Sequence, residues 1–407
     1  MADWQTLSDR INHVAPSATL AVDSKAKAMK AAGIDVIGFG AGEPNFPTPA
    51  PIVAAAAAAV QDPKNYRYTP TAGLPELRKA IADKTLRDSG YEIDPSQVIV
   101  TNGGKQAVYE SFQILLNEGD EVIIPTPYWT SYPEAVKLAG GVPVTVFAGA
   151  DRNFEPSIED IEAARTEHTK AIIVNTPNNP TGAVWKPETV KAIAQWAIEH
   201  HVWVISDEIY EHLNYDGAKT TYIGAAVPEV RSQLLVLNGV AKTYAMPGWR
   251  VGWMVLSGNK RLAKDYIEGL NMLANMRMCS NVPAQSVVQT ALGGHQSVKD
   301  YLVPGGRIYD QRELVYNMLN DIPGITAVKP KAAFYIFPKI DVKKFNIHSD
   351  EQFALDLLHD KHILISHGGA FNWQEPDHFR VVYLPRISML KETIGEIGDF
   401  FSTYWQA

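Results

Sequence analysis

The chain has 407 residues, 46% hydrophobic and 20% charged, as is ordinary for a globular protein, and its length predicts two domains or one large domain with a smaller companion. A net charge of -8 without any basic cluster argues against nucleic acid as a partner. A single cysteine, Cys279, excludes an internal disulfide, and no export signal or membrane-length apolar run is visible, so we expect a cytoplasmic protein without a membrane partner.

The first 50 residues divide into an arm, a helix and a rigid loop. Residues 1–15 are polar and weakly patterned, and are predicted to form an arm. Residues 16–33 have the pattern of a capped helix that ends at a glycine. A strand-like segment then leads into Ala41–Pro49, where Gly42 and three prolines predict a fixed loop. This loop either only joins two elements or places a backbone group beside a ligand, and both interpretations stay open.

Short apolar runs alternate with helical patterns through the middle of the chain. An alanine-rich helix comes first, followed by a turn-rich loop that contains Tyr68, a tyrosine more typical of packing than of chemistry. The alternation that follows is typical of a largely parallel sheet covered on both faces, in which ligands bind at the carboxyl ends of the strands. The runs expected to be strands are 98–100, 121–124, 171–174, 202–205 and 234–237. Each of them is directly followed by a distinctive cluster.

Longer helical patterns begin at about residue 259 and are followed by a smaller α+β region. Its expected strands and helices are strands near 333–337, 363–366 and 379–383, and helices around 351–359 and 390–404. Repeats, low-complexity segments and flexible linkers are absent from the sequence. We therefore expect the two parts of the chain to form one working unit.

The stretch Val236–Gly252 carries one lysine, Lys242, among small and apolar residues. Because surface lysines usually have polar neighbours, we expect Lys242 to be partly removed from water. Desolvation disfavours the ammonium and makes a lysine nucleophilic, as a covalent bond to a carbonyl cofactor requires. On this stretch alone, a lysine stem packed beside a loop with its head in water is an equal alternative.

Two glycines, Gly103 and Gly104, open a predicted helix. Glycines let the backbone approach an anion, and a helix N-terminus offers free N–H groups. Arg250, eight residues after Lys242, could supply a cation to the same phosphate. The sequence here lacks the GxxxxGKS/T motif of a nucleotide-binding loop and the GxGxxG motif of a dinucleotide-binding fold. The Gly-Gly pair alone is therefore also compatible with a simple turn.

Polar and aromatic side chains follow three other expected strands. Trp129 stands in a loop between prolines and could stack on a flat heteroaromatic ring, or be a core aromatic. Prolines fix the consecutive asparagines in Asn175–Gly182, which could aim an amide at an oxygen. Asp207 ends a very apolar run and requires a cationic partner if it is buried, unless it is a helix N-cap. Tyr210, at an expected helix start, could reach the same ring.

These clusters together supply an amine, a carboxylate for a protonated ring nitrogen, a ring-oxygen pair, a stacking aromatic and a phosphate cup. An aldehyde-bearing pyridine phosphate requires this combination of groups. The sequence therefore predicts a pyridoxal phosphate site at the strand ends, and it predicts no metal site.

The chain resembles the fold-type I, pyridoxal-phosphate-dependent aminotransferases of class I, most of all the bacterial aspartate aminotransferase subgroup Iβ. The likeness runs from about residue 16 to 385 and is carried, in family order, by AGEPNF, YTPTAGLPELR, GGKQA, PYWTSYPE, PNNPTG, SDEIYEHL, GVAKTYAMPGWRVG and FRVVY. It implies an α/β fold with a mostly parallel seven-stranded sheet covered by helices. The implied large domain spans 51–299 and the small α+β domain combines 16–50 with 300–407. It also implies a homodimer with shared active sites.

The resemblance assigns roles to individual residues. Lys242 binds the cofactor covalently and moves the α-proton of the substrate, while Asp207 holds the pyridine nitrogen. Further cofactor contacts are the ring contacts Trp129, Asn179 and Tyr210, the phosphate contacts Gly103, Gly104, Lys105 and Arg250, and Tyr68 of the partner subunit, which also counts as catalytic. Arg380 clamps the substrate α-carboxylate, for which a planar guanidinium is suited. The other substrate contacts are Gly42, Lys105, Trp129 and Asn179.

Substrate choice rests on fewer residues. The resemblance implies that Lys105, helped by Ser17 and Thr19, meets the side-chain carboxylate of a dicarboxylic substrate. Ala15 replaces a lysine found in members that transaminate prephenate, which argues against that activity. From about Trp253 onwards the sequence resembles bacterial alanine (glutamate–pyruvate) aminotransferases more than the Iβ aspartate aminotransferases.

The predicted activity is therefore ping-pong transamination between an amino acid and a 2-oxo acid, with L-aspartate and 2-oxoglutarate as the first choice. Alanine–glutamate transamination is the alternative within the class. A β-lyase on the same cofactor would release ammonia without needing an oxo acid. A cofactor-binding regulator usually carries a DNA-binding domain in front, and an arm of 15 residues leaves no room for one.

Overall fold

The computed structural model describes residues 7–15 and 19–407, and its centre is a seven-stranded sheet. The strands lie in the order β2-β8-β7-β6-β5-β3-β4, and only β8 runs antiparallel to its neighbours. Their bounds are β2 Val98–Thr101, β3 Glu121–Thr126, β4 Val142–Phe147, β5 Thr169–Val174, β6 Trp203–Asp207, β7 Leu234–Gly239 and β8 Gly252–Leu256. The expected mostly parallel, seven-stranded sheet is confirmed, and all five runs expected to be strands lie in it.

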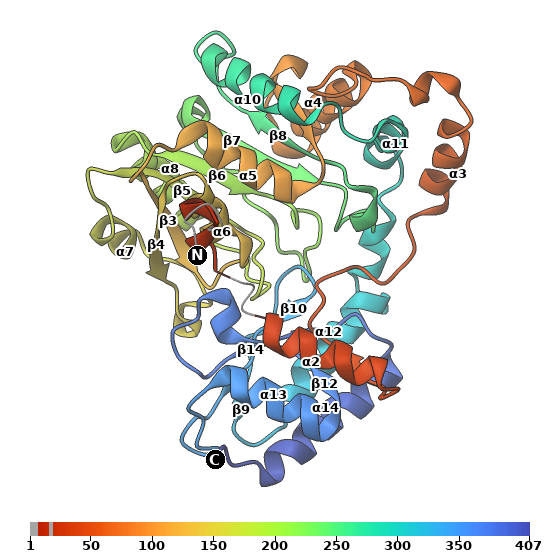
Figure 1. Ribbon diagram of the computed structural model, residues 1–407, viewed down its shortest axis with the longest axis vertical. Helices are drawn as coiled ribbons and strands as arrows, with labels where there is room; N and C mark the ends of the chain where they lie inside the picture. The colour runs from red at the N-terminus through yellow and green to blue at the C-terminus, as the bar shows by residue number, and fades with distance from the viewer. Residues whose placement is uncertain (1–6, 16–18) are drawn as a thin grey trace.

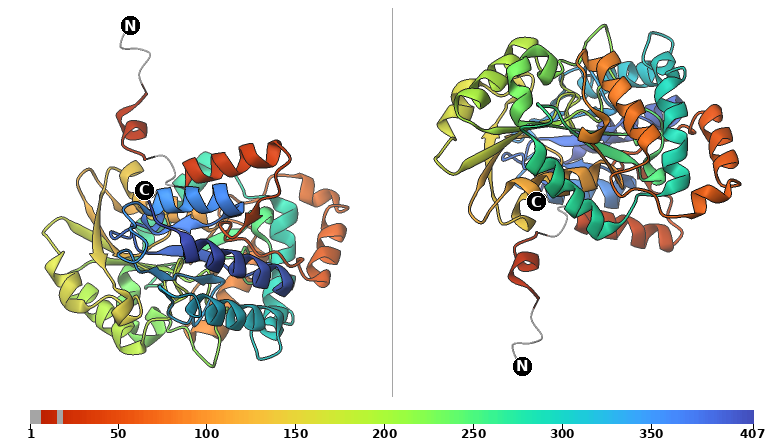
Figure 2. Two further views of the ribbon diagram at one scale, coloured as in Figure 1. Left: turned by 90° about the horizontal axis from the view of Figure 1, so that it is seen from below. Right: turned by 90° about the horizontal axis from the view of Figure 1, so that it is seen from above.

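Both faces of the sheet are buried because neighbouring residues of each strand point to opposite sides. Val98 and Val100 of β2 belong to one hydrophobic cluster, and Ile99 between them belongs to another. The first cluster is covered by α4 (Pro75–Ser89), α8 (Pro187–Glu199) and α11 (Val282–Gly293). The second is covered by α5 (Gly104–Leu115), α6 (Ser131–Leu138) and α10 (Lys264–Arg277). The ribbon accordingly shows helices on both sides of the strands (Figure 2).

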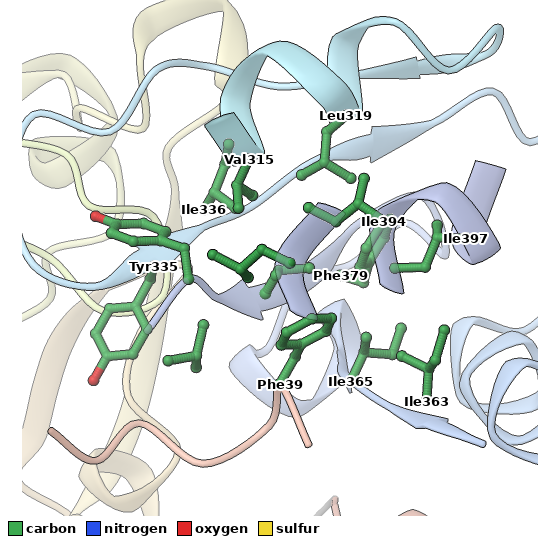
Figure 3. Close-up of a cluster of buried hydrophobic side chains, with 14 of the residues drawn as sticks. Phe39, Val315, Leu319, Tyr335, Ile336, Ile363, Ile365, Phe379, Ile394 and Ile397 are labelled. Atoms are coloured by element: carbon green, nitrogen blue, oxygen red, sulfur yellow. The ribbon is translucent and has the colours of Figure 1, made fainter. Parts of the chain in front are cut away.

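A separate hydrophobic cluster is built mainly from the two ends of the chain, in the lower half of Figure 1, and also includes Tyr210, Leu213, Tyr215 and Ala245 from the middle. Its core side chains include Phe39, Leu319, Phe379 and Ile394 (Figure 3). The contributing elements include α2 (Leu20–Ala31), α12 (Arg307–Asn320), α13 (Asp350–Lys361), α14 (Ile387–Thr403), β9 (Ile325–Thr326), β10 (Tyr335–Ile336), β11 (Lys339–Ile340), β12 (Ile363–Leu364) and β14 (Phe379–Val382). β13 (Ser366–His367) pairs antiparallel with β14. β1 (Ile37–Gly38), near the start of the chain, pairs in parallel with β12. This separate core supports the proposal of a small domain made of 16–50 and 300–407.

The remaining elements connect these layers or lie at the surface. They are α1 Asp9–Asn12, α3 Ala50–Ala59, α7 Ile158–Ala163 and α9 Ile223–Ala226. α1 lies at the periphery, away from the sheet (Figure 2). Among the residues that the structure describes, no helix is both long and apolar enough to span a bilayer.

One strand was not predicted from the sequence, and one local expectation is wrong. The missed strand is β4, which lies at the edge of the sheet with side chains that are mostly exposed or half-buried. The segment after β6 forms turns at 209–212 instead of a helix start, because Tyr210 and Glu211 are held by contacts to distant elements.

Candidate active site

A cavity of about 530 Å³ lies at the carboxyl ends of the parallel strands. Its wall combines loops that follow β5, β6 and β7, the start of α5, and residues from both ends of the chain. All residues predicted for the site line this cavity except Gly103 and Tyr68. Tyr68 is 82% exposed and lies outside the cavity.

Lys242 enters the cavity from the loop between β7 and β8. The side chain is half-buried, in agreement with the expectation of partial desolvation, and its Nζ donates a hydrogen bond to the carbonyl of Gly42. Nζ also lies 5.9 Å from the centre of the Tyr210 ring. A second contact between the same two loops runs from Thr48 Oγ1 to the carbonyl of Ala245, at 2.7 Å. The Gly42 loop thus joins two elements and also places a backbone carbonyl beside the lysine.

Asp207 is a buried carboxylate at the end of β6, 8% exposed. Tyr132 donates its hydroxyl to Oδ2 at 2.7 Å, and the Ile209 N–H donates to Oδ1 at 3.2 Å. No helix begins here, so the N-cap alternative is wrong. Asp207 forms no ion pair with any described residue, and burial raises its pKa, with the two hydrogen bonds and Lys242 acting in the other direction.

Arg380 is the opposite case, a buried guanidinium on β14 that is 7% exposed. Its Nη1 donates to Asn179 Oδ1 at 2.9 Å, and its Nη2 donates to the Gly40 carbonyl at 2.5 Å. The guanidinium carbon lies 4.8 Å from the centre of the Tyr335 ring and 4.7 Å from that of Phe371. Within the described part of the chain it has no ion-pair partner, and burial lowers its pKa.

One cavity therefore holds a buried anion and a buried cation, and neither forms an ion pair with a described residue. Burying a charge without a partner is costly, so both groups indicate a ligand that brings the complementary charges. The ligand must place a positive group at Asp207 and a negative group at Arg380.

A cradle for an anion lies where α5 begins. Gly103 adopts a left-handed φ of 86°, and a Cβ there would lie 2.8 Å from Cζ of Arg250, so only glycine fits beside the guanidinium. A Cβ on Gly252 would lie 2.7 Å from the backbone nitrogen of Gly104. Arg250 is exposed and is held by the carbonyls of Pro247 and Asn102, both at 2.9 Å. The N–H groups of a 12-residue helix, with Arg250 beside them, suit a phosphate.

Lys105, in the first turn of α5, reaches both the cradle and Trp129. Its Nζ lies 5.1 Å from the Trp129 ring, and it forms no ion pair with a described residue. Partial burial, followed by the nearby charge of Arg250, lowers its pKa. Thr19 also lines the cavity, whereas Ser17 lies outside the described residues.

Several site residues were not predicted from the sequence. Tyr132 holds the Asp207 carboxylate, Asn175 donates to the Asp207 carbonyl at 3.1 Å, and Tyr335 bonds Tyr210 through the two hydroxyls at 2.8 Å. Tyr132 and Asn175 belong to clusters that the sequence highlights, so the strand-end pattern carried a signal. Tyr335 lies on a short, buried strand and carried none.

The chain is similar over most of its length to proteins of known family. The family model described as aminotransferase class I and II matches residues 34–396. An aspartate aminotransferase of Streptomyces avermitilis is 45% identical over 97% of this chain and 96% of its own length. The glutamate-pyruvate aminotransferase AlaA of Haemophilus influenzae is 42% identical over 98% of both chains. The crystal structure of an aminotransferase from Escherichia coli superposes with a TM-score of 0.94, at 38% identity over 99% of both chains.

Proposed function

The chain belongs to the aminotransferase class I and II family, whose class I members depend on pyridoxal phosphate, and we propose that it transfers the amino group of L-aspartate to 2-oxoglutarate. The products are oxaloacetate and L-glutamate, formed by a ping-pong mechanism. One observation carries the proposal: Asp207 and Arg380, neither in an ion pair with a described residue, line the cavity that Lys242 enters.

The residues present fit pyridoxal phosphate. A protonated pyridine nitrogen supplies the cation that buried Asp207 lacks, and the glycine cradle with Arg250 suits the phosphate. Tyr210 and Asn179 offer polar groups to the ring oxygen, and Trp129 offers an aromatic face. Bound there, the cofactor supplies an electron sink for the carbanion formed at the substrate α-carbon.

The remaining steps belong to residues of this chain. Arg380 binds the substrate α-carboxylate, the anion that its buried guanidinium lacks. Lys242 Nζ takes the α-proton of the amino acid and returns a proton when the oxo acid is formed. Gly42 holds the same Nζ through its carbonyl, which restricts the direction from which the proton is taken.

Lys105 supports a dicarboxylic substrate. It is a cation without an ion-pair partner among the described residues, and it lies at the cavity wall beside Trp129. We therefore assign the side-chain carboxylate of aspartate or glutamate to Lys105.

The proposal includes a cytoplasmic homodimer in which Tyr68 of the partner subunit completes the site. Exposure of Tyr68 supports this, because a tyrosine that is 82% exposed beside other exposed apolar side chains is typical of an interface. Met272 and Met276 of α10 are 63% and 84% exposed, and a hydrogen bond of 2.6 Å between Thr71 and Asn275 joins the Tyr68 loop to that helix.

Alanine–glutamate transamination is the second candidate. It is supported by relatives that are 42% identical and named glutamate-pyruvate aminotransferases. Every residue assigned to the cofactor and to the α-carboxylate serves either reaction, so the difference rests on the contact with the distal carboxylate.

Steady-state assays test the proposal directly. With 2-oxoglutarate as acceptor, oxaloacetate formed from aspartate is compared with pyruvate formed from alanine, and free ammonia is measured without any oxo acid. We expect kcat/KM for aspartate to exceed that for alanine at least about tenfold, since one added charged hydrogen bond is worth this factor. A preference for alanine would transfer the assignment to the second candidate, and ammonia release without an oxo acid would indicate a β-lyase.

A further inference from the structure

Tyr335 joins the two charged ends of the cavity, although it comes from a part of the chain remote in sequence from both. It is 1% exposed on the two-residue strand β10, at the edge of the cluster drawn in Figure 3. Its hydroxyl lies 2.8 Å from that of Tyr210, and the ring centres are 5.6 Å apart at 85°. The Arg380 guanidinium lies over its ring at 4.8 Å. One side chain therefore contacts a residue assigned to the cofactor and a residue assigned to the substrate.

The direction of the hydroxyl pair follows from hydrogen counting. A tyrosine hydroxyl has one hydrogen to donate and lone pairs to accept another. When Tyr210 donates its hydrogen to an oxygen in the cavity, the hydrogen of Tyr335 has two acceptors in range. These are the Tyr210 oxygen at 2.8 Å and the Gly42 carbonyl at 3.4 Å. The shorter contact is with Tyr210, so Tyr335 donates to the hydroxyl that faces the ligand.

The hydrogen bond from Tyr335 changes the donor strength of the Tyr210 hydroxyl. Accepting a hydrogen bond polarises the Tyr210 hydroxyl and makes it a stronger donor, an effect enhanced in a buried site. It also fixes the rotation of that hydroxyl, which is otherwise free about the ring bond. Burial raises the pKa of Tyr210, which keeps Tyr210 a protonated donor.

Gly42 preserves the position of the Tyr335 hydroxyl. A Cβ on Gly42 would lie 2.6 Å from Tyr335 Oη, too close without displacing the ring. The Gly42 carbonyl is in turn the acceptor for Lys242. The tyrosine pair, Gly42 and Lys242 are therefore packed as one unit.

We propose that Tyr335 is a positioning residue, which donates its hydroxyl hydrogen to Tyr210 and so strengthens the hydrogen bond from Tyr210 to the ring oxygen of the cofactor. This rests on the proposed function, because the cofactor contact of Tyr210 is part of it. The ring of Tyr335 separately supports Arg380, so replacing only the hydroxyl separates the two roles.

The test is a pH titration of the visible absorbance of the bound cofactor in the wild-type holoenzyme and in Tyr335→Phe. The stronger donor favours the ionised ring oxygen, so losing the Tyr335 hydroxyl should move the titration midpoint to higher pH, by about 0.5 unit for one hydrogen bond of average strength. KM for the amino acid should change less than about twofold, since the ring under Arg380 is kept, while kcat falls.

Tyr383→Phe is the matched control. Tyr383 is also fully buried and also bonds a tyrosine, Tyr215, at 3.2 Å, with a second bond to the Ala333 carbonyl at 2.9 Å, but it does not line the cavity. It should lower the melting temperature about as much as Tyr335→Phe and leave the titration midpoint at the wild-type value. Equal midpoints in the two variants would overturn the proposal.

A double-mutant cycle keeps the test decisive if stability changes. In a Tyr210→Phe background, Tyr335→Phe should add no further shift of the midpoint, because it acts through Tyr210. Additive shifts would show that Tyr335 acts by another route. If the wild-type holoenzyme itself shows no pH-dependent visible band and no response to amino acids, the proposed function fails, whatever the variants do.

Discussion

At the scale of single residues, two buried charged groups lack an ion-pair partner among the described residues. Asp207 and Arg380 line the same cavity, and burial disfavours the charged form of each. Such groups destabilise the protein alone and stabilise its complex with a ligand of opposite charge. Removing one of these charges should therefore leave the cofactor-free protein at least as stable as wild type, but weaken binding of the ligand that carries the opposite charge.

Asp207→Asn tests this difference in sign. The cofactor-free variant should melt at the wild-type temperature or above it, because a buried anion without a cation has been removed. Affinity for pyridoxal phosphate should fall about 10²-fold, the usual cost of removing one partner of a buried charged pair. Thermal melts with and without the cofactor measure both effects, and Asp341→Asn, at a position outside the cavity, is the control. A cofactor-free variant clearly less stable than wild type would contradict the account.

Glu208, the neighbour of Asp207, predicts a pH effect on stability. Burial, followed by nearby Glu211, raises the pKa of Glu208 to about 8 from its ordinary value of 4.5. The folded protein thus holds a proton that the unfolded chain releases above about pH 4.5, so stability from this group is lost as the pH rises from 4.5 through 8. Glu208→Gln keeps the neutral form at every pH. As the pH rises from 6 to 9, the melting temperature of Glu208→Gln should increase relative to that of wild type by about 2 °C or more.

The exposed Glu229→Gln is the control for this comparison. It should follow the wild-type melting curve at both pH values. If Glu208→Gln follows the wild type as well, Glu208 is not held protonated in the folded protein.

At the scale of elements, the strand ends show what could be predicted from the sequence. Apolar runs identified five of the six parallel strands, because such strands are buried on both faces. The clusters after them gathered at one edge, since parallel strands end together. β4 escaped prediction because its pattern is that of an exposed edge, and Tyr335 because its partner Tyr210 lies 125 positions away in the sequence. Contacts of this kind depend on packing between elements and leave no local pattern.

The close approach of β8 to the start of α5 predicts the effect of Gly252→Ala. A Cβ on Gly252 would lie 2.7 Å from the backbone of both Gly103 and Gly104, so the cradle must shift. We expect a lower melting temperature and weaker binding of pyridoxal phosphate by about tenfold or more, the result of losing about one charged hydrogen bond. Gly248→Ala is the matched control, because a Cβ there meets nothing within 4 Å. Equal cofactor affinity in the two variants would contradict the assignment of the cradle to the phosphate.

At the scale of the whole molecule, the cavity is assembled from distant parts of the chain. Gly42 comes from the N-terminal part, Lys242 from the central sheet region and Arg380 from β14. Tyr68 is the one predicted cofactor residue that the chain exposes at its surface, away from the cavity. The proposed homodimer with a shared site would account for this position, and its symmetry would give two equivalent sites.

Mixing two variants tests the shared site. Lys242→Ala should be inactive, and Tyr68→Ala should lose at least about tenfold in kcat/KM, the effect of one charged hydrogen bond. In mixed dimers, one site combines the intact Lys242 of one chain with the intact Tyr68 of the other. Random assembly should therefore restore about a quarter of the wild-type activity. A mixture no more active than its components, or a fully active Tyr68→Ala, would contradict the shared site.

The most direct measurement of the central claim is a single-turnover assay on the cofactor-loaded protein. Aspartate, glutamate and alanine are added separately without an oxo acid, and loss of the visible absorbance of the bound cofactor is followed in wild type and Lys105→Met. We expect fast loss with aspartate and glutamate and slow loss with alanine, and in Lys105→Met a larger decrease in rate for the two dicarboxylic substrates than for alanine. Alanine reacting as fast as aspartate in the wild-type enzyme would contradict the role of Lys105, and no change with any amino acid would contradict transamination itself.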